Sequence, residues 1–313
     1  VTEAIEKDEK VTAENKDPIA KRTAEYLYEE YTHILEKFGS PTPEALCESG
    51  LFHARLLEKF DFHDIVISIK SSDVYTMVTA TKLLAQSCDY PLHLGVTEAG
   101  TERMGLIKSS VGIGSLLLDG IGDTIRVSLT EAPENEVPVA KMLVEHFQNR
   151  EGEFEVLHPE RYSPFEYRRR TSAPIIAHSE ITDDYIVVDA TSENPTAEWR
   201  SAILDIEDDT PVVIHRRYDD TDFETLAVKA AADMGVMLLD GLADGIWIDA
   251  PQFSKEQIKE LELMIMQAAR VRFSRTEYIA CLSCGRTLYD LQSTLAKIKA
   301  ATSHLKDLKI GVM

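Results

Sequence analysis

Two cysteines late in the chain have a spacing that would let them share a metal ion, a cluster or a disulfide. Cys281 and Cys284 lie three residues apart, between a strand-like run and a predicted helix. A redox pair of the thioredoxin type would need this motif at a helix N-terminus in a thioredoxin-type fold. A zinc site needs a second ligand pair, and the sequence spaces none for it. An iron–sulfur cluster needs three or four ligands, of which two are visible. All three alternatives stay open on these residues alone.

A second group of chemically capable residues lies at the ends of three predicted strands, 64–70, 91–98 and 124–129. Ligands of (β/α) barrels bind at the C-terminal ends of the strands, so these side chains are expected to meet. The group consists of Lys70, Thr97, Glu98, Arg126 and Ser128. Two cations and two hydroxyls favour a phosphate or diphosphate, and the glutamate could act as an acid or base beside it.

Other conspicuous residues have simpler interpretations. Gly112-Ile-Gly114 could offer backbone amides to an anion near a helix start, but helix–strand packing explains it equally well. His93 is interpreted as a hydrogen-bonded core histidine, and 168–170 as a solvated basic loop. Cys47 and Cys88 are interpreted as packing thiols.

The elements that must position these residues alternate along the chain. A helix is expected from Asp17-Pro18 to Gly39, and another over 43–59. Capping boxes are expected at Thr221–Glu224 and Ser254–Gln257. In the first block, helices are predicted at 73–87, 106–119 and 136–149. After a composition break at 150–173, strands are predicted near 174–178, 185–190, 211–216 and 245–249, with helices near 196–205, 222–238 and 254–270. Continuous apolar strands alternating with helices predict parallel sheets buried on both faces.

An internal repeat spans the composition break. Residues 116–129 (LLLDGIGDTIRVSL) align with 237–250 (MLLDGLADGIWIDA), and the same offset pairs Gly114 with Gly235. Such a period indicates a duplicated strand–helix unit. Arg126 is replaced by Trp247 and Ser128 by Asp249, so the first copy is expected to bind the anion and the second to be a structural relative.

Composition excludes several classes of protein. The net charge is −21, from 33 Lys+Arg against 54 Asp+Glu, which argues against nonspecific nucleic-acid binding. Four cysteines in 313 residues do not make a disulfide scaffold and favour a reducing compartment. No apolar run is long enough for a membrane span. A cytoplasmic location is expected.

Four stretches together resemble the 4-hydroxy-3-methylbut-2-enyl diphosphate synthase family, GcpE/IspG. The stretches are 91–100 (PLHLGVTEAG), 108–114 (KSSVGIG), 119–129 (DGIGDTIRVSL) and 281–292 (CLSCGRTLYDLQ). The resemblance is close over about 31–149 and 276–313. Residues 150–275 look like the extra domain of the long, plant- and Bacteroides-type members.

The resemblance implies a two-electron reductive ring opening in non-mevalonate isoprenoid biosynthesis. The substrate would be 2-C-methyl-D-erythritol 2,4-cyclodiphosphate, and ferredoxin or flavodoxin would supply electrons through a [4Fe-4S] cluster. Residue by residue, Lys70, Arg126, Ser128 and Lys108 would bind the substrate. Thr97 and Glu98 would face its reacting part as catalytic residues, and Cys281 and Cys284 would be cluster ligands.

The resemblance also implies an α/β fold made of partial TIM-barrel-like (β/α) units. The expected domains are an arm and helix at 1–40, the C-terminal part of the catalytic barrel at 41–150, a repeat-related insert at 151–275, and the start of an α+β iron–sulfur domain at 276–313. The family's third cysteine and glutamate would follow 313. The chain is therefore expected to be an inactive piece on its own, which a homodimer could complete, and to be stromal if it comes from a plant-like source. The alternative is a non-catalytic scaffold or diphosphate-binding module.

Overall fold

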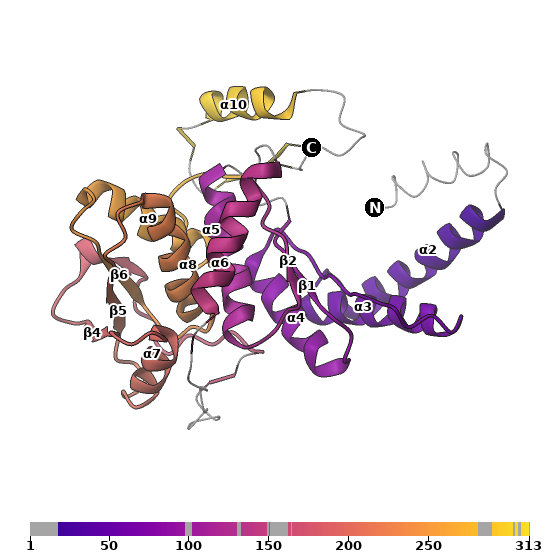
Figure 1. The fold of residues 1–313 in the computed structure, drawn as a ribbon, viewed down its shortest axis with the longest axis horizontal. Helices are drawn as coiled ribbons and strands as arrows, with labels where there is room; N and C mark the ends of the chain where they lie inside the picture. The colour runs from indigo at the N-terminus through magenta and orange to yellow at the C-terminus, as the bar shows by residue number, and fades with distance from the viewer. Residues whose placement is uncertain are drawn as a thin grey trace.

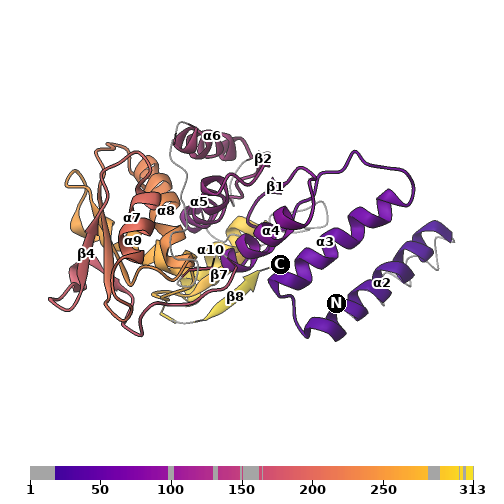
Figure 2. The ribbon, with the colours of Figure 1, turned by 90° about the horizontal axis from the view of Figure 1, so that it is seen from below.

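The described chain begins with two packed helices. The computed structural model describes residues 18–97, 102–129, 133–148, 150, 162–163, 165–280, 290–302, 304–305 and 308–312. Helix α2 (Pro18–Phe38) is followed by Gly39, whose φ of 72° suits a glycine. Helix α3 (Pro43–Glu58) begins after Thr42, whose side chain accepts a hydrogen bond from Ala45 N. Figure 2 shows the two helices side by side. The predicted helices are confirmed over these residues.

The first parallel unit contains the predicted anion-binding strands. Its elements are α4 (Val74–Ser87), β1 (His93–Leu94), α5 (Glu102–Leu118), β2 (Thr124–Ile125), a 3-10 turn (Pro133–Asn135) and α6 (Glu136–Phe147). Strand β1 pairs in parallel with β2, and a parallel bridge joins Ile67 to Leu92. The backbone of Ile67 accepts from His93 N at 2.9 Å, which attaches the predicted strand 64–70 to the edge of this sheet.

One face of this first sheet is open, contrary to the prediction of a sheet buried on both faces. Ile65, Ile67 and Ile69 are buried toward the helices, whereas Val66 on the alternate face is 61% exposed. Ser68 and Arg126 are also exposed on that alternate face. Successive strand residues point to opposite faces, so the polar residues of the three strands share one surface. The apolar face alone carries the packing of this sheet against the helices.

The second unit is a four-stranded parallel sheet with the order β3-β6-β5-β4. Its elements are β3 (Ile176–Ala177), a 3-10 turn (His178–Glu180), β4 (Ile186–Asp189), α7 (Pro195–Leu204), β5 (Val212–Arg217), α8 (Phe223–Leu239), β6 (Gly245–Asp249) and α9 (Lys255–Ala268). The capping box of Ser254 and Gln257 is confirmed. The box at Thr221 is wrong: Asp222 caps α8, because its carboxylate accepts from Thr225 N.

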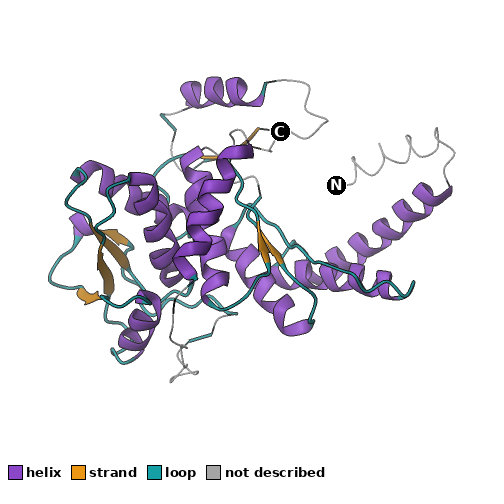
Figure 3. Cartoon of the chain, viewed as in Figure 1, coloured by secondary structure: helices purple, strands orange, loops and turns teal. Residues whose placement is uncertain are grey.

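The two repeat units pack back to back through equivalent helices, α5 and α8 (Figures 1 and 3). A Cβ atom at Gly114 would lie 3.0 Å from Ala232 Cβ, and one at Gly235 would lie 2.6 Å from Val111 Cγ2. Because Gly235 is the repeat counterpart of Gly114, and Ala232 that of Val111, the contact is reciprocal, as across a two-fold axis. The two sheets consequently lie on opposite sides of a shared helical layer rather than in one barrel.

Ion pairs reinforce the same contact at the ends of the two helices. Arg200 of α7 donates to Asp240 Oδ2 at 2.7 Å and to Asp119 Oδ1 at 3.2 Å. Asp119 and Asp240 are repeat counterparts that follow α5 and α8. One guanidinium reaches both, so the C-terminal ends of the two helices lie together. Lys82 of α4 also binds Asp119, at 2.7 Å.

The C-terminal unit is small and has its own core. Strands β7 (Glu277–Ala280) and β8 (Lys309–Val312) pair in parallel, and α10 (Leu291–Thr302) covers them. Leu295 and Val312 form a cluster separate from the main core. Among the described residues, no helix is long and apolar enough to cross a membrane.

The Gly112-Ile-Gly114 segment lies inside α5 rather than at its start. A Cβ atom at Gly112 would lie 2.8 Å from Met77 Cε and 2.9 Å from Val96 Cγ2. The glycine therefore permits close packing of α5 on α4 and on the sheet. The hypothesis that this segment offers backbone amides to an anion is wrong, because these amides belong to the interior of a helix.

Candidate anion-binding site

Lys70 and Arg126 flank Gly95 on the open face of the first sheet. Arg126 N donates to Leu94 O at 2.9 Å, which continues the β1–β2 register and sets Gly95 beside Arg126. A Cβ atom at Gly95 would lie 3.2 Å from Lys70 Nζ and 3.1 Å from the backbone oxygen of Arg126. The missing side chain at Gly95 thus leaves the floor between two cations free, which is an arrangement suited to an anion.

The positive charges of Lys70 and Arg126 repel each other. Burial lowers the pKa of Lys70, Arg126 lowers it further, and Glu136 partly offsets both. An anion placed between the cations would relieve this repulsion and favour the charged ammonium. Glu136 begins α6 and lies 3.8 Å from Arg126 Nε, and its other oxygen accepts from Leu129 N. The carboxylate therefore orients the arginine at the edge of the site.

Hydroxyl groups lie on the same strands. Ser128 follows Arg126 at the next position on the same face and is buried. Thr97 lies two residues beyond Gly95, and its amide donates to Ser71 O at 3.2 Å. The structure thus brings four predicted residues, Lys70, Thr97, Arg126 and Ser128, to the ends of neighbouring strands.

His93 belongs to this face and not to the core. It is half-buried, and its Nδ1 lies 2.8 Å from Thr124 Oγ1 on the adjacent strand. Burial lowers the pKa of His93, and the nearby Lys70 and Arg126 lower it further. A neutral ring is therefore favoured at this position. The alternation of apolar Leu92 and Leu94 around His93 was the sequence signal for its exposure to the polar face.

The remaining predicted residues lie elsewhere or outside the described chain. Lys108 is buried in α5, where its Nζ binds Glu277 Oε1 at 2.5 Å, and the structure gives it no contact with Lys70 or Arg126. Glu98, Cys281 and Cys284 lie outside the described residues. Sequence reasoning did not single out Glu277, Gly95 or Glu136.

The equivalent face of the second sheet has a different chemistry. Trp247 stands where the first repeat has Arg126, and it pairs in register with His215. Its ring lies 4.4 Å from the His215 ring and 6.5 Å from the His178 ring. His215 Nδ1 in turn contacts the Asp189 carboxylate. The indole ring of Trp247 carries no positive charge where the first repeat has Arg126. This difference agrees with the expectation that only the first copy binds an anion.

Whether the chain could hold an iron–sulfur cluster depends on the two predicted cysteine ligands, Cys281 and Cys284. Among the residues that the structure describes, no group of three or more His, Cys, Asp or Glu side chains could hold a metal ion. The described strand β7 ends at Ala280, immediately before Cys281. Two thiols at this spacing have the donor chemistry of an iron–sulfur ligand pair, so the residues present are compatible with a cluster.

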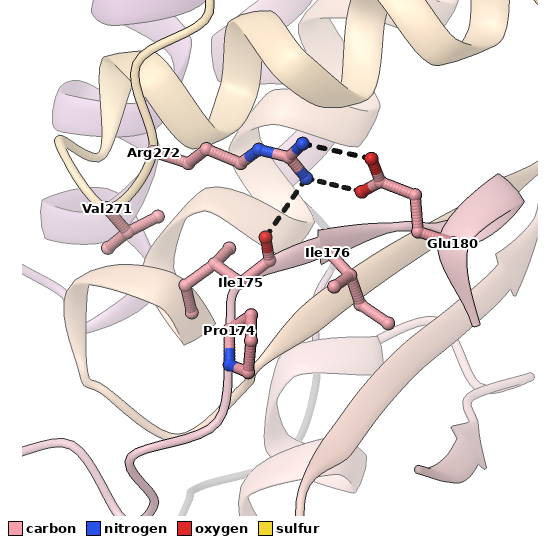
Figure 4. Close-up of a pocket in the computed structure, with 6 residues that line it drawn as sticks. All are labelled: Pro174, Ile175, Ile176, Glu180, Val271 and Arg272. Carbon is pink, nitrogen blue, oxygen red and sulfur yellow. Dashed lines mark hydrogen bonds and ion pairs between the residues drawn. The ribbon is translucent and has the colours of Figure 1, made fainter. Parts of the chain in front are cut away.

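A pocket in the second unit differs from this anion site in its charge (Figure 4). It is lined by Pro174, Ile175, Ile176, Glu180, Val271 and Arg272. Arg272 forks onto the Glu180 carboxylate and also donates to Ile175 O at 3.0 Å. The two charges of the pocket are paired with each other, so it presents no cation to a diphosphate.

Comparison with known proteins relates the chain to one family. Residues 31–141 match the family model described as the GcpE TIM-barrel domain. The chain is 38% identical to the 4-hydroxy-3-methylbut-2-en-1-yl diphosphate synthase (flavodoxin) of Porphyromonas gingivalis, over 90% of this chain and 61% of that protein. Residues 31–141 therefore belong to the GcpE family of TIM-barrel domains.

Other members of the family show similar coverage. The synthase of the same name from Phocaeicola vulgatus is 36% identical over 90% of this chain and 63% of its own length. That from Akkermansia muciniphila is 33% identical over 90% of this chain and 60% of its own length. The chain thus spans about three fifths of the curated relatives it matches. The resemblance to this family, inferred from four motifs, is confirmed.

Proposed function

We propose that this chain carries the diphosphate-binding strands and a cysteine ligand pair of an enzyme that opens 2-C-methyl-D-erythritol 2,4-cyclodiphosphate reductively. Two electrons and two protons would convert this substrate to 4-hydroxy-3-methylbut-2-enyl diphosphate and water. The observation that carries the proposal is the row of Lys70, Gly95 and Arg126 on the open face of the first sheet. Relatives that share the name synthase (flavodoxin) support a flavodoxin as the electron donor.

The cations would bind and orient the cyclic diphosphate. Lys70 would act as a point charge and Arg126 as a planar fork, while the Ser128 hydroxyl donates a further hydrogen bond. Gly95 supplies the room for phosphate oxygens between the two cations. Fixing both phosphates would place the carbon skeleton of the substrate toward Thr97, at the end of its strand.

Proton delivery is assigned to the same edge of the sheet. Glu98 directly follows Thr97 and would supply a proton to the departing oxygen. His93 is held neutral by burial and by the neighbouring cations, so it would donate or accept a hydrogen bond without adding charge. A neutral ring beside two cations avoids further repulsion and leaves the positive field directed at the diphosphate.

A [4Fe-4S] cluster would supply the electrons, with Cys281 and Cys284 as two of its ligands. These thiols follow strand β7 in sequence; β7 ends at Ala280 and pairs in parallel with β8. Everything else that the chain contributes is substrate binding, orientation and proton handling by the residues named above.

The binding role is tested by a Lys70→Ala, Arg126→Ala double variant titrated with the cyclic diphosphate in a calorimeter. Each charge-assisted hydrogen bond contributes about 1.5–3 kcal/mol, so affinity should fall roughly a hundredfold or more. Arg217→Ala is the matched control, because Arg217 is an exposed cation at a strand end of the second sheet. Unchanged affinity in the double variant would contradict the proposal. Tight binding without turnover by the cluster-loaded protein would instead support the diphosphate-binding module.

A further inference from the structure

A buried ion pair ties strand β7, which precedes the two cysteines in sequence, to the first unit. Glu277 is the first residue of β7, and its Oε1 lies 2.5 Å from Nζ of Lys108 in α5. Both side chains are almost fully buried, at 4% and 2% exposed. Burial alone would raise the pKa of Glu277, but Lys108 and Arg270 outweigh it and lower the pKa. The glutamate is therefore held in its charged form.

Arg270 extends this pair to the helix that follows the Lys70 strand. Its Nη1 lies 3.2 Å from Glu277 Oε2, and its Nε lies 2.8 Å from Asp73 Oδ2. Asp73 also caps α4, because its other oxygen accepts from Thr76 N. Arg270 adopts a φ of 60°, which is uncommon for a residue with a side chain. The backbone after α9 thus takes a costly conformation at the residue that bridges the two carboxylates.

Both ends of this chain of ion pairs are near proposed functional residues in sequence. Asp73 comes three residues after Lys70, and Ser71 between them accepts a hydrogen bond from Thr97 N. At the other end, Glu277 comes four residues before Cys281. The side chains of Asp73, Arg270, Glu277 and Lys108 therefore connect the anion-binding strand end to strand β7, which ends immediately before Cys281 in sequence.

We propose that Lys108, Glu277, Arg270 and Asp73 form a positioning linkage that sets strand β7, and with it the C-terminal unit, relative to the Lys70–Arg126 anion site. This inference rests on the proposed function for its catalytic consequence, but the linkage itself is a property of the described residues. Lys108 thereby has a positioning role in place of the direct substrate contact predicted for it.

The separate core of the C-terminal unit explains why such a linkage is needed. Leu295 and Val312 pack with Tyr278, Ile298 and Ile310, so their burial stabilises the unit itself. Figures 1 and 2 show β7, β8 and α10 as a distinct yellow element beside the helical layer. Apolar contact tolerates sliding, whereas hydrogen-bonded charges at fixed angles do not. A buried ion pair is weak evidence for stability but suits the specification of one arrangement.

The sharpest variant is Arg270→Lys, with Arg272→Lys as its matched control. Lysine keeps the charge of Arg270 but cannot fork between Asp73 and Glu277. Arg272 lies two residues away and is similarly exposed, at 32% against 30%, but its partners, Glu180 and Ile175 O, both lie within the second unit (Figure 4). Both substitutions replace one partly exposed guanidinium group with an ammonium group, but only Arg270→Lys interrupts the linkage.

The first measurement is a distance and needs no turnover. Spin labels attached by a thiol-independent chemistry at Gln86, at the end of α4, and Ala296, in α10, report the placement of the C-terminal unit. The distance distribution should broaden or shift in Arg270→Lys and match the wild-type protein in Arg272→Lys. An unshifted distribution in Arg270→Lys, or an equal shift in both variants, would overturn the proposal.

The second measurement separates positioning from binding in the cluster-loaded enzyme. A displacement of about 1 Å can lower a rate by roughly a hundredfold, so kcat of Arg270→Lys should fall at least about tenfold. The dissociation constant for inorganic diphosphate should stay within about threefold, because Lys70 and Arg126 are intact. An unchanged kcat would overturn the linkage. If the wild-type enzyme itself does not turn over the cyclic diphosphate, the proposed function fails, and the distance measurement alone decides the linkage.

Discussion

Val111 packs directly over the Cα atom of Gly235, and the repeat counterparts of these two residues, Ala232 and Gly114, make the mirror contact. A Cβ atom at Gly235 would lie 2.6 and 2.7 Å from the two methyl carbons of Val111. Interiors are packed too densely to absorb such an overlap without moving a helix. The α5–α8 contact is therefore the position at which the duplicated units are most sensitive to added volume.

Gly235→Ala should destabilise the protein although alanine is the better helix former. Overpacking of a dense core costs about 1–3 kcal/mol, which exceeds the gain of about 1 kcal/mol expected from helix propensity. Chemical denaturation would measure the difference. Gly50→Ala is the control: Gly50 is also helical, but a Cβ there would meet Ile67 Cγ2 at an ordinary 3.6 Å. Gly50→Ala should be neutral or stabilising, and equal effects of the two substitutions would refute the packing argument.

Gly95→Ala should weaken diphosphate binding more than it weakens the fold. The new methyl would lie 3.2 Å from Lys70 Nζ and on the floor of the anion site. We expect roughly a tenfold loss of affinity for inorganic diphosphate, equivalent to about 1.4 kcal/mol. Calorimetric titration gives the affinity and thermal unfolding gives the stability. An unchanged dissociation constant would show that the anion does not approach Gly95.

Asp233 should make the stability of the protein depend on acid pH. Burial alone would raise its pKa, but His146 and Arg150 outweigh burial and lower the pKa to about 2. Its folded pKa lies below the value of about 3.9 for an unfolded chain, so its contribution is complete above about pH 4 and is lost as pH falls toward 2. That contribution is on the order of 2 kcal/mol.

The test compares Asp233→Asn with the wild-type protein in denaturant titrations between pH 2 and pH 7. The variant should be less stable near neutrality and should lose less stability on acidification. Asp183→Asn, at an exposed aspartate, should follow the wild-type curve. Parallel curves for Asp233→Asn and wild type would mean that the aspartate is not held charged by His146 and Arg150.

Much of the layout was predictable because it follows from local chemistry. Pro18 and Gly39 bound α2, and Ser254 with Gln257 begins α9, since caps and terminators act within one turn. The parallel strands followed from their alternation with helices. The Asp-Gly turns of the repeat were also recognisable, and Gly120 and Gly241 both adopt φ near 70°.

The packing of segments that are far apart in sequence was harder to predict from the sequence. The sequence marked 116–129 and 237–250 as copies, but it could not show that α5 and α8 pack together, because that depends on small residues meeting across the repeat. The open face of the first sheet was missed since Val66 looks like any buried strand residue. Domain bounds at 150 and 275 stay predictions.

In the candidate site, too, local features were predicted and long-range contacts were not. Lys70, Thr97, Arg126 and Ser128 were found because strand ends of parallel sheets converge. Lys108 was assigned to the substrate by family resemblance, yet its partner Glu277 lies 169 residues away in sequence. No local pattern connects such a pair. The roles of Glu98, Cys281 and Cys284 remain proposals.

The placement of tryptophan gives the second repeat unit an optical signal of its own. The chain has two tryptophans, Trp199 in α7 and Trp247 in β6, and both belong to the second unit. Trp199 is fully buried, and Trp247 lies between the imidazole rings of His178 and His215. Tryptophan fluorescence therefore reports on the second unit alone, whereas circular dichroism at the amide wavelengths reports on both units. Superimposable melting curves from the two methods would mean that the α5–α8 seam makes the halves unfold as one.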